Sequence, residues 1–377
     1  MEELVYDSAI IGGGLAGLAL SIELAKAGRK VILIEKETYP FHKVCGEYIS
    51  MESYDYLKRL GLPLDTMDVS RINKVLISAP DGSSLKRPLV LGGFGISRYT
   101  LDHTLASLAK ERGVTLWENT TVENVIFSEE QFQLNTTKGL VKANVTAGAY
   151  GKRSALDRKL NRSETLPVAK EDQYIAVKYH VNLNFPADQI ELHNFDKGYC
   201  GISKVDQGRY CLCYLTHADN LRANQQDIKK MEEEVVMKNP FLKKYFTEAK
   251  FLYEQPLTIS QITFHVKSAV HDHVLMLGDA AGNIAPLSGN GMSQALRSAH
   301  LAASEINSFL SGTISRGEME QRYAKKWNSN FNLRIRSGKY LQALFGKKNL
   351  TVFTIRMLKY LPWVTDGFIR MTHGKPF

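Results

Sequence analysis

The sequence predicts an α/β fold: a Rossmann-like nucleotide-binding domain, interrupted by an inserted antiparallel β-sheet and followed by a helical C-terminal tail. Three observations lead to this prediction. They are a glycine-rich strand–helix–strand pattern in the first forty residues, short strands with turn signals in the middle, and a helical, basic segment at the end. The 377 residues are 44% hydrophobic and 23% charged, which is typical of globular proteins and not of disordered or fibrous ones.

The first forty residues alternate between strand and helix patterns. Residues 4–11 and 30–35 are short apolar runs rich in β-forming residues. Between them, apolar residues recur at three- and four-residue spacing from Leu15 to Ala25, which predicts a helix with one apolar face, and Gly28 is its predicted end. This order predicts a βαβ unit.

A G-x-G-x-x-G motif joins the first strand to the helix. Gly12 permits a tight turn, Gly14 lets the backbone approach a pyrophosphate, and Gly17 lets helix and sheet pack closely. Glu35 ends the second strand, where its carboxylate can accept both hydroxyls of an adenosine ribose and would repel a 2′-phosphate, so the site suits FAD or NAD and not NADP. The residues predicted to hold this part of the cofactor are Gly12, Gly14, Ala16, Gly17, Glu35 and Lys36.

A segment late in the chain distinguishes FAD from NAD. Residues 274–278 predict a buried strand, the sequence Gly-Asp-Ala-Ala-Gly follows at 278–282, and a helix pattern begins near Ala295. This segment resembles the G-D-A-A-G…P…G-x-G segment of the glutathione-reductase-type flavoproteins, in which the aspartate contacts the ribityl chain and the helix N-terminus points at the flavin pyrimidine. The resemblance implies flavin contacts from Asp279, Gly289, Gly291 and Met292, and a substrate contact from Pro286.

Residues 41–50 resemble the C-G-E/G loop of the geranylgeranyl reductases, which covers the cofactor and brings its cysteine close to the isoalloxazine ring. The resemblance implies that Cys45 lies beside the flavin, as the candidate catalytic residue, and that Gly46 and Glu47 line the pocket.

Residues 95–102 match a third segment of these flavoproteins. There an arginine at a helix start lies beside the flavin and the cofactor phosphates, and Arg98 has that position here. Val122, in the strand expected after this helix, matches the position whose backbone contacts the adenine.

Other positions depart from the patterns of particular subfamilies. Aromatic hydroxylases of this superfamily usually have an aspartate where Tyr150 stands and a histidine where Gly282 stands, and both differences favour a reductase. The reductase motif G-Y-G-W-x-F-P is incomplete at residues 198–204, which leaves Tyr199 and Cys200 as the predicted substrate contacts without an isoprenoid signature. The W-x-W-x-I-P motif of tryptophan halogenases does not occur.

The middle of the chain predicts the inserted sheet. Residues 72–98 and 174–214 have strand patterns with turn signals at 80–82 and 206–208, and residues 219–244 have a charged, helical pattern. The predicted boundaries give the nucleotide-binding domain residues 1–71, 98–165 and 266–310, the substrate sheet residues 72–97 and 166–265, and the tail residues 311–377.

The net charge of +9 belongs to the tail. Residues 311–377 contain 13 Lys and Arg against three acidic residues, and the rest of the chain is nearly neutral. This distribution argues against a nucleic-acid groove, along which basic residues would be spread. Apolar residues alternate with the basic ones, so the tail is expected to lie on an anionic membrane surface or to be a packing helix that covers the substrate tunnel, and the two roles are compatible.

The remaining composition excludes several classes of site. The four cysteines form no disulfide framework and no metal-ligand spacing, so we expect no metal. The acidic start and the lack of an apolar run of about 20 residues predict neither a signal peptide nor a membrane span, hence a cytoplasmic protein, with a peripheral membrane contact as the alternative location.

Together the sequence predicts an FAD-dependent oxidoreductase of the geranylgeranyl reductase-like kind, in the superfamily shared with aromatic hydroxylase-type monooxygenases. The leading hypothesis is hydride transfer from reduced flavin to a C=C bond of a lipophilic, prenyl- or polyene-like substrate, with NAD(P)H or another reductant as transient electron donor. The alternative is monooxygenation of an aromatic or polyketide substrate through a C4a-hydroperoxide, and a third hypothesis is a flavin-binding or membrane-scaffold protein without catalysis.

Overall fold

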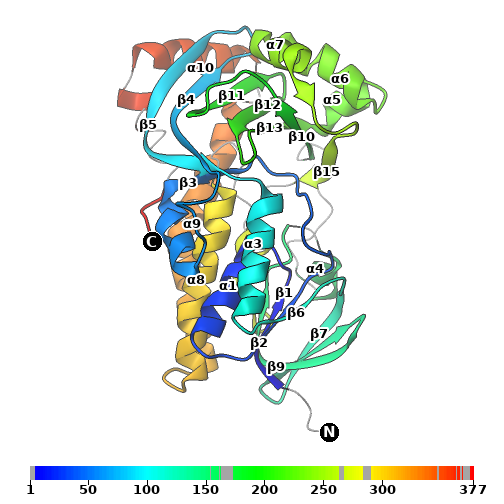
Figure 1. Cartoon of the computed structure of the whole chain (residues 1–377), viewed down its shortest axis with the longest axis vertical. Coiled ribbons are helices and arrows are strands. Elements are labelled where there is room, and N and C mark those ends of the chain that lie inside the picture. The colour runs from blue at the N-terminus through cyan, green and yellow to red at the C-terminus, as the bar shows by residue number, and fades with distance from the viewer. Residues whose placement is uncertain are drawn as a thin grey trace.

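The computed structural model describes residues 5–152, 154–160, 162, 173–262, 267–282, 290–345, 348–361, 363–365, 367 and 374–377. The molecule is elongated, with one β-sheet at each end and long helices running beside the lower one (Figure 1). Among the helices of the described ranges, none is both long and apolar enough to cross a membrane.

The lower body is built on a sheet whose centre is five parallel strands in the order β17-β9-β1-β2-β6. Their carboxyl ends meet at the edge that faces the upper body, where an open α/β sheet binds its ligands. The strands of this sheet are β1 (Val5–Ile11), β2 (Val31–Ile34), β6 (Thr115–Trp117), β7 (Val122–Ser128), β8 (Gln131–Thr136), β9 (Gly139–Gly148), β16 (Val270–His271) and β17 (Val274–Met276).

Helices cover this sheet and share its core. α1 (Leu15–Lys26) is the predicted helix after the glycine motif, and it packs against α8 (Gly291–Leu310) and α3 (Arg98–Glu111). The short helices of this body are η1 (Met51–Ser53), α2 (Tyr54–Leu60), α4 (Ala155–Lys159) and η5 (Gly278–Ala280).

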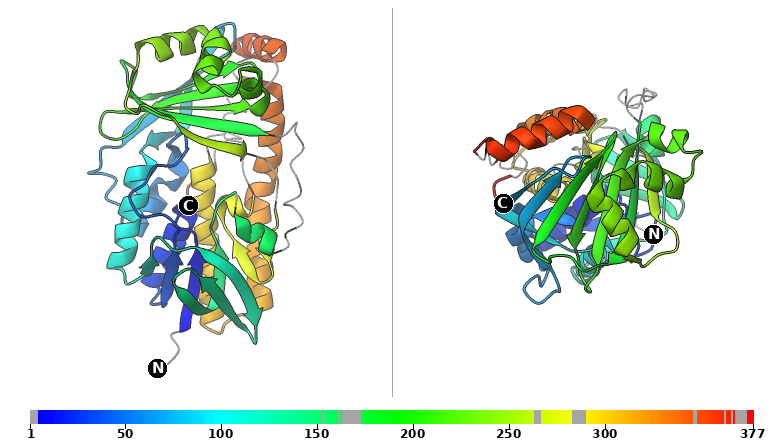
Figure 2. Two further views of the ribbon diagram at one scale, coloured as in Figure 1. Left: turned by 90° about the vertical axis from the view of Figure 1, so that its right-hand side faces the viewer. Right: turned by 90° about the horizontal axis from the view of Figure 1, so that it is seen from above.

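The tail helix α9 (Arg316–Phe345) also belongs to the lower body. It runs along α8 (Figure 2, left), and every fourth residue of one of its faces is buried in the core of that body. These residues are Met319, Tyr323, Trp327, Phe331 and Ile335. This burial agrees with the expectation of a packing helix for the described part of α9.

The upper body is a nine-stranded sheet in the order β14-β10-β13-β12-β11-β4-β5-β3, with β15 beside β10. The prediction of an antiparallel sheet is wrong at one place, because β11 and β4 are parallel. These two strands come from the two separate insertions, which enter the sheet in the same direction and meet there. The strands are β3 (Tyr48–Ser50), β4 (Ser70–Ser78), β5 (Ser84–Gly95), β10 (Tyr174–Asn182), β11 (Gln189–Phe195), β12 (Gly198–Lys204), β13 (Tyr210–His217), β14 (Lys250–Phe251) and β15 (Leu257–Ile262).

One face of the upper sheet is covered by the predicted helical stretch, α5 (Ala218–Ala223), α6 (Ile228–Glu234), η4 (Val236–Lys238) and α7 (Pro240–Glu248). The last helix, α10 (Lys348–Tyr360), packs beside β5 at the outer edge of the molecule (Figure 2, right). The predicted domain boundaries near 165 and 265 lie outside the described residues.

Candidate active site

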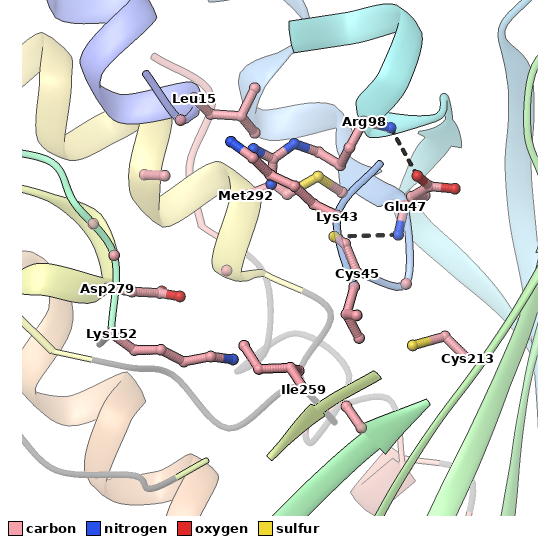
Figure 3. Close-up of a pocket in the computed structure, with 18 of the residues that line it drawn as sticks. Leu15, Lys43, Cys45, Glu47, Arg98, Lys152, Cys213, Ile259, Asp279 and Met292 are labelled. Atoms are coloured by element: carbon pink, nitrogen blue, oxygen red, sulfur yellow. Dashed lines mark hydrogen bonds between the residues drawn. The ribbon is translucent and has the colours of Figure 1, made fainter. Parts of the chain in front are cut away.

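A cavity of about 1480 Å³ lies between the two bodies. Its lower part is lined by the glycine turn after β1, the start of α8 and the loop of residues 41–47. Its upper part lies under the nine-stranded sheet and reaches α10. Figure 3 shows Asp279 and Lys152 directed into this space on one side and Cys45 and Ile259 on another.

The glycine turn leaves the N-terminus of α1 open toward the cavity. Gly12 has a φ of +101°, which favours glycine, and a Cβ at Gly17 would lie 2.0 Å from the carbonyl oxygen of Gly12. No side chain caps the helix and its first turn contains no acidic residue, so its N–H groups are available to an anion. A Cβ at Gly14 would point toward the Lys43 ammonium and the Arg98 guanidinium, at 3.9 and 4.0 Å.

Arg98 and Lys43 make this end of the cavity cationic. Arg98 forms two hydrogen bonds of 2.7 Å to the carboxylate of Asp102, one turn further along α3, and Lys43 lies 3.1 Å from the same carboxylate. Burial alone would raise the pKa of Asp102, but Arg98 and Lys43 hold it below its ordinary value. Two cations thus share one carboxylate, which leaves net positive charge beside Gly14 for a pyrophosphate.

Glu35 is tied to the glycine turn. Its carboxylate accepts the Gly13 N–H at 2.6 Å and the Glu37 N–H at 3.0 Å, and the residue is 6% exposed at the cavity wall. The Tyr39 hydroxyl donates to the Gly13 carbonyl, a support that the sequence analysis missed. Lys36 lies at the rim with a largely exposed side chain, and Val122 lines the same end of the cavity.

The loop of residues 41–47 is held to the upper sheet by Glu47. This residue is fully buried and has a φ of +55°. Its carboxylate accepts the Arg98 N–H at 2.8 Å and lies 2.5 Å from both Lys178 Nζ and His180 Nε2. Burial alone would raise the pKa of Glu47, but its bonds to His180 and Lys178 hold the value below the ordinary one.

Lys178 and His180 stand two residues apart on β10, so they share one face of that strand. Lys178 also donates to the Lys43 carbonyl at 3.0 Å, which fixes the other end of the loop. Two charged or polar residues on one face of an otherwise apolar strand are the signal that could have predicted this clamp.

The same cluster contains the one group of metal-ligand type found in the described ranges. Ligand atoms of Glu47, His180 and Cys211 lie within 4.8 Å of one another, where the sequence predicted no metal. Both carboxylate oxygens of Glu47 already bind the Lys178 ammonium, the His180 ring or the Arg98 N–H. We therefore assign the cluster to the clamp of the loop.

The far side of the cavity is formed by η5 and the start of α8. Burial raises the pKa of the Asp279 carboxyl, and attraction to Lys152 opposes this shift. No side chain caps α8, its first turn contains no acidic residue, and a Cβ at Gly291 would meet no atom within 4 Å. Met292 lines the cavity beside it. The predicted residues Pro286 and Gly289 lie outside the described residues.

The upper part of the cavity is apolar. Tyr199 and Cys213 line it, but Cys200 does not: its side chain is fully buried in the core on the other face of β12. The prediction of Cys200 as a substrate contact is therefore withdrawn, because side chains alternate along a strand. The apolar lining residues include Val75, Ile77, Leu85, Leu89, Ile190, Leu192, Ile259, Ile355 and Leu358.

Comparison with known proteins identifies the family of the chain. The sequence profile of the FAD binding domain matches residues 5–326, most of the chain. The chain belongs to this family. It is an FAD-dependent oxidoreductase, and its resemblance to geranylgeranyl reductases is confirmed by the relatives described next.

Two relatives match the chain over most of its length. The digeranylgeranylglycerophospholipid reductase of Thermoplasma acidophilum is 24% identical over 344 residues, which are 86% of this chain and 84% of the relative. The conditioned medium factor receptor 1 of Dictyostelium discoideum is 29% identical over 363 residues, 88% of this chain and 69% of that protein.

Solved structures show the same fold. A flavin-dependent brominase has a TM-score of 0.82 at 20% identity and is matched over 98% of this chain and 93% of its own. A geranylgeranyl bacteriochlorophyll reductase-like protein of Thermoplasma acidophilum has a TM-score of 0.78 at 19% identity, over 94% of this chain and 91% of its own.

The residues present fit FAD. Two uncapped helix N-termini face the cavity, and the space at Gly14 and Gly291 is open where backbone would have to approach the cofactor. The cation pair of Arg98 and Lys43 suits the pyrophosphate, and Glu35 lies at the expected ribose end. Within the described ranges only burial and nearby charges act on the Asp279 carboxyl, with no hydrogen bond to it, so its oxygens are available to the ribityl hydroxyls.

Proposed function

We propose that this enzyme reduces C=C bonds of a lipophilic, prenyl- or polyene-like substrate. The observation that supports this most directly is the continuity of the cavity: its flavin end opens without a partition into an apolar chamber formed by β4, β5, β11, β15 and α10. An extended hydrocarbon can lie in this chamber with one double bond over the cofactor. Relatives named as reductases of geranylgeranyl lipids are consistent with such a substrate.

Bound FAD would supply the hydride when reduced, and the protein would bind the cofactor, position the substrate and limit the access of water. Arg98, Lys43 and the N-terminus of α1 would hold the pyrophosphate, and the N-terminus of α8 would favour negative charge on the ring. The clamp of Glu47 by Lys178 and His180 holds Cys45 at the cavity wall, where we place it beside the reacting face. The apolar lining limits water at the reacting carbons, and the substrate's second hydrogen would come as a proton from solvent at the mouth of the cavity or from a nearby acid.

NAD(P)H or another reductant is the proposed electron donor, acting transiently. The proposal includes a peripheral contact with a membrane surface, since a prenyl- or polyene-like compound partitions into lipid and residues 311–377 carry a net charge of +10. Monooxygenation of an aromatic or polyketide substrate is the competing function. Because the fold is shared with a flavin-dependent brominase, the experiment also includes a reaction with oxygen.

The test is a single turnover of the reduced holoenzyme without oxygen. A panel of polyprenyl and polyene compounds is added, and the visible absorbance of oxidised flavin is followed together with the product mass. We expect flavin reoxidation by one class of compound and a product two hydrogens heavier. Flavin that stays reduced until oxygen-18 gas (18O2) is admitted, with oxygen-18 then found in the product, would establish the monooxygenase instead.

A further inference from the structure

The outer face of α10 exposes an unusual number of large apolar side chains. Nine such residues are exposed in the described part of the chain, and five of them fall between residues 350 and 363. They are Leu350 (39% exposed), Phe353 (64%), Met357 (42%), Tyr360 (82%) and Trp363 (74%). The first four recur at helical three- and four-residue spacing, so they form one row along the helix, which we call the outer row.

The opposite face of α10 belongs to the cavity. Ile355 and Leu358 are buried against Leu85 of β5, and they line the apolar chamber together with Thr354. Met357 belongs to both faces: it lines the chamber and is 42% exposed. The helix is therefore a thin wall between the apolar chamber and the surroundings of the protein.

The charged side chains of α10 are all positive. No acidic residue occurs from 321 to 365. Lys348 and Lys359 are exposed on α10 and have no ion-pair partner within the described ranges. Arg356 pairs with Asp81 at 2.7 Å, which ties α10 to the turn between β4 and β5.

We propose that the outer row of α10 docks on an anionic bilayer surface. Phe353 and Tyr360 of the outer row, with Trp363 just beyond the end of α10, then enter the boundary between headgroups and acyl chains, and Lys348 and Lys359 contact anionic headgroups. A two-fold contact with a second copy fits less well, because it would bring the cations of two α10 helices together without acidic partners. When the protein is docked in this way, Met357 lies between the apolar chamber and the lipid, and a membrane-borne substrate enters the chamber there.

The proposed docking is inferred from the exposed residues alone. Only the chemical identity of the substrate that enters the chamber rests on the proposed reductase function. The experiment therefore needs no turnover. Full-length holoenzyme is mixed with vesicles of phosphatidylcholine, with or without phosphatidylglycerol, and binding is measured by co-sedimentation. Tryptophan emission gives a second readout, because of the three tryptophans Trp327 is buried, Trp117 is half-buried and Trp363 is 74% exposed.

We expect binding to the anionic vesicles, with a blue shift of emission that disappears in Trp363→Phe while binding remains. The double variant Phe353→Ser/Tyr360→Ser should bind the anionic vesicles at least about tenfold more weakly than the wild type. The double variant Lys348→Glu/Lys359→Glu should lose binding to a similar extent. Leu140→Ser, at a 51% exposed position on β9, is the matched control and should bind as the wild type does.

Equal binding by wild type and the α10 variants would overturn the proposal, as would no binding to either vesicle. If sedimentation velocity shows a dimer, and if Phe353→Ser dissociates it, the outer row is the contact surface for a second copy of the chain instead. None of these outcomes bears on hydride transfer, which is measured in single turnover without vesicles.

Discussion

At the scale of single residues, the cofactor end depends on a few buried charges that face one another. Glu35 accepts two backbone N–H groups, and Asp102 holds both Arg98 and Lys43 in place. Each carboxylate is a point where a small change in charge has a measurable effect on cofactor binding.

Glu35→Gln should weaken FAD binding about tenfold to a hundredfold, because a charged acceptor for the ribose hydroxyls is lost while the amide oxygen can still accept the Gly13 N–H. Titration of the apoprotein with FAD, followed by flavin fluorescence, measures the effect. Glu111→Gln, an exposed change at the end of α3, is the control. Unchanged affinity in Glu35→Gln would refute the ribose role.

Lys178→Met should cost about 3–5 kcal/mol of unfolding free energy, because it leaves the Glu47 carboxylate buried without its main counter-charge. Chemical denaturation of the holoenzyme measures this. Lys74→Met breaks an exposed pair with Asp188 and should cost less than about 1 kcal/mol. Equal losses in the two variants would contradict the assignment of Glu47 as a buried clamp.

The acid stability of the loop follows from Glu47, which faces Lys178, His180 and the Arg98 N–H. Its folded-state pKa lies below the ordinary 4.5, so its contribution is fully present above that value and is lost as the pH falls through the lowered pKa. The difference in unfolding temperature between the wild type and Glu47→Gln should therefore be largest above pH 4.5 and shrink below it. A constant difference would show that Glu47 is not ionised.

At the scale of elements, α9 explains a departure from the hydroxylase pattern. A Cβ at Gly282 would lie 3.0 Å from the Trp327 ring and 3.1 Å from Ile335, so the tail helix fills the space that a histidine would need; the φ of +157° at Gly282 adds a backbone strain that is the same with or without Trp327. Gly282→His should destabilise the protein by about 1–3 kcal/mol through overpacking. Gly282→His in a Trp327→Ala background should cost markedly less, as thermal unfolding of the four proteins would show. An equal cost in both backgrounds would contradict this packing.

Elements that are specified locally could be predicted from sequence. The strands and helix of the βαβ unit follow from apolar spacing and from Gly28, and the hairpin after β4 follows from its turn residues. Contacts between distant segments could not be predicted. The parallel pairing of β11 with β4 and the burial of one face of α9 depend on where separate parts of the chain meet, and local periodicity does not encode this.

The same division holds in the candidate site. Glycines and charged residues with fixed local roles, such as Gly12 and Arg98, could be predicted by motif, whereas the side-chain partners of Glu47 come from β10, more than a hundred residues away. Cys200 was misplaced because the motif did not indicate which face of β12 each residue occupies.

At the scale of the whole molecule, the two bodies enclose one cavity that is charged at its lower end and apolar at its upper end. This division supports an arrangement in which the charged lower end anchors the cofactor and the apolar upper end holds a hydrocarbon. The basic tail contributes to both: α9 packs into the lower core, and α10 closes the apolar chamber.

The measurement that tests this account most directly is anaerobic single turnover of the reduced holoenzyme with a polyprenyl lipid. The account predicts one equivalent of oxidised flavin for each double bond that is reduced, with no oxygen atom added to the product. Reduced flavin that never reacts without oxygen, together with oxygen-18 in the product formed under 18O2, would contradict it.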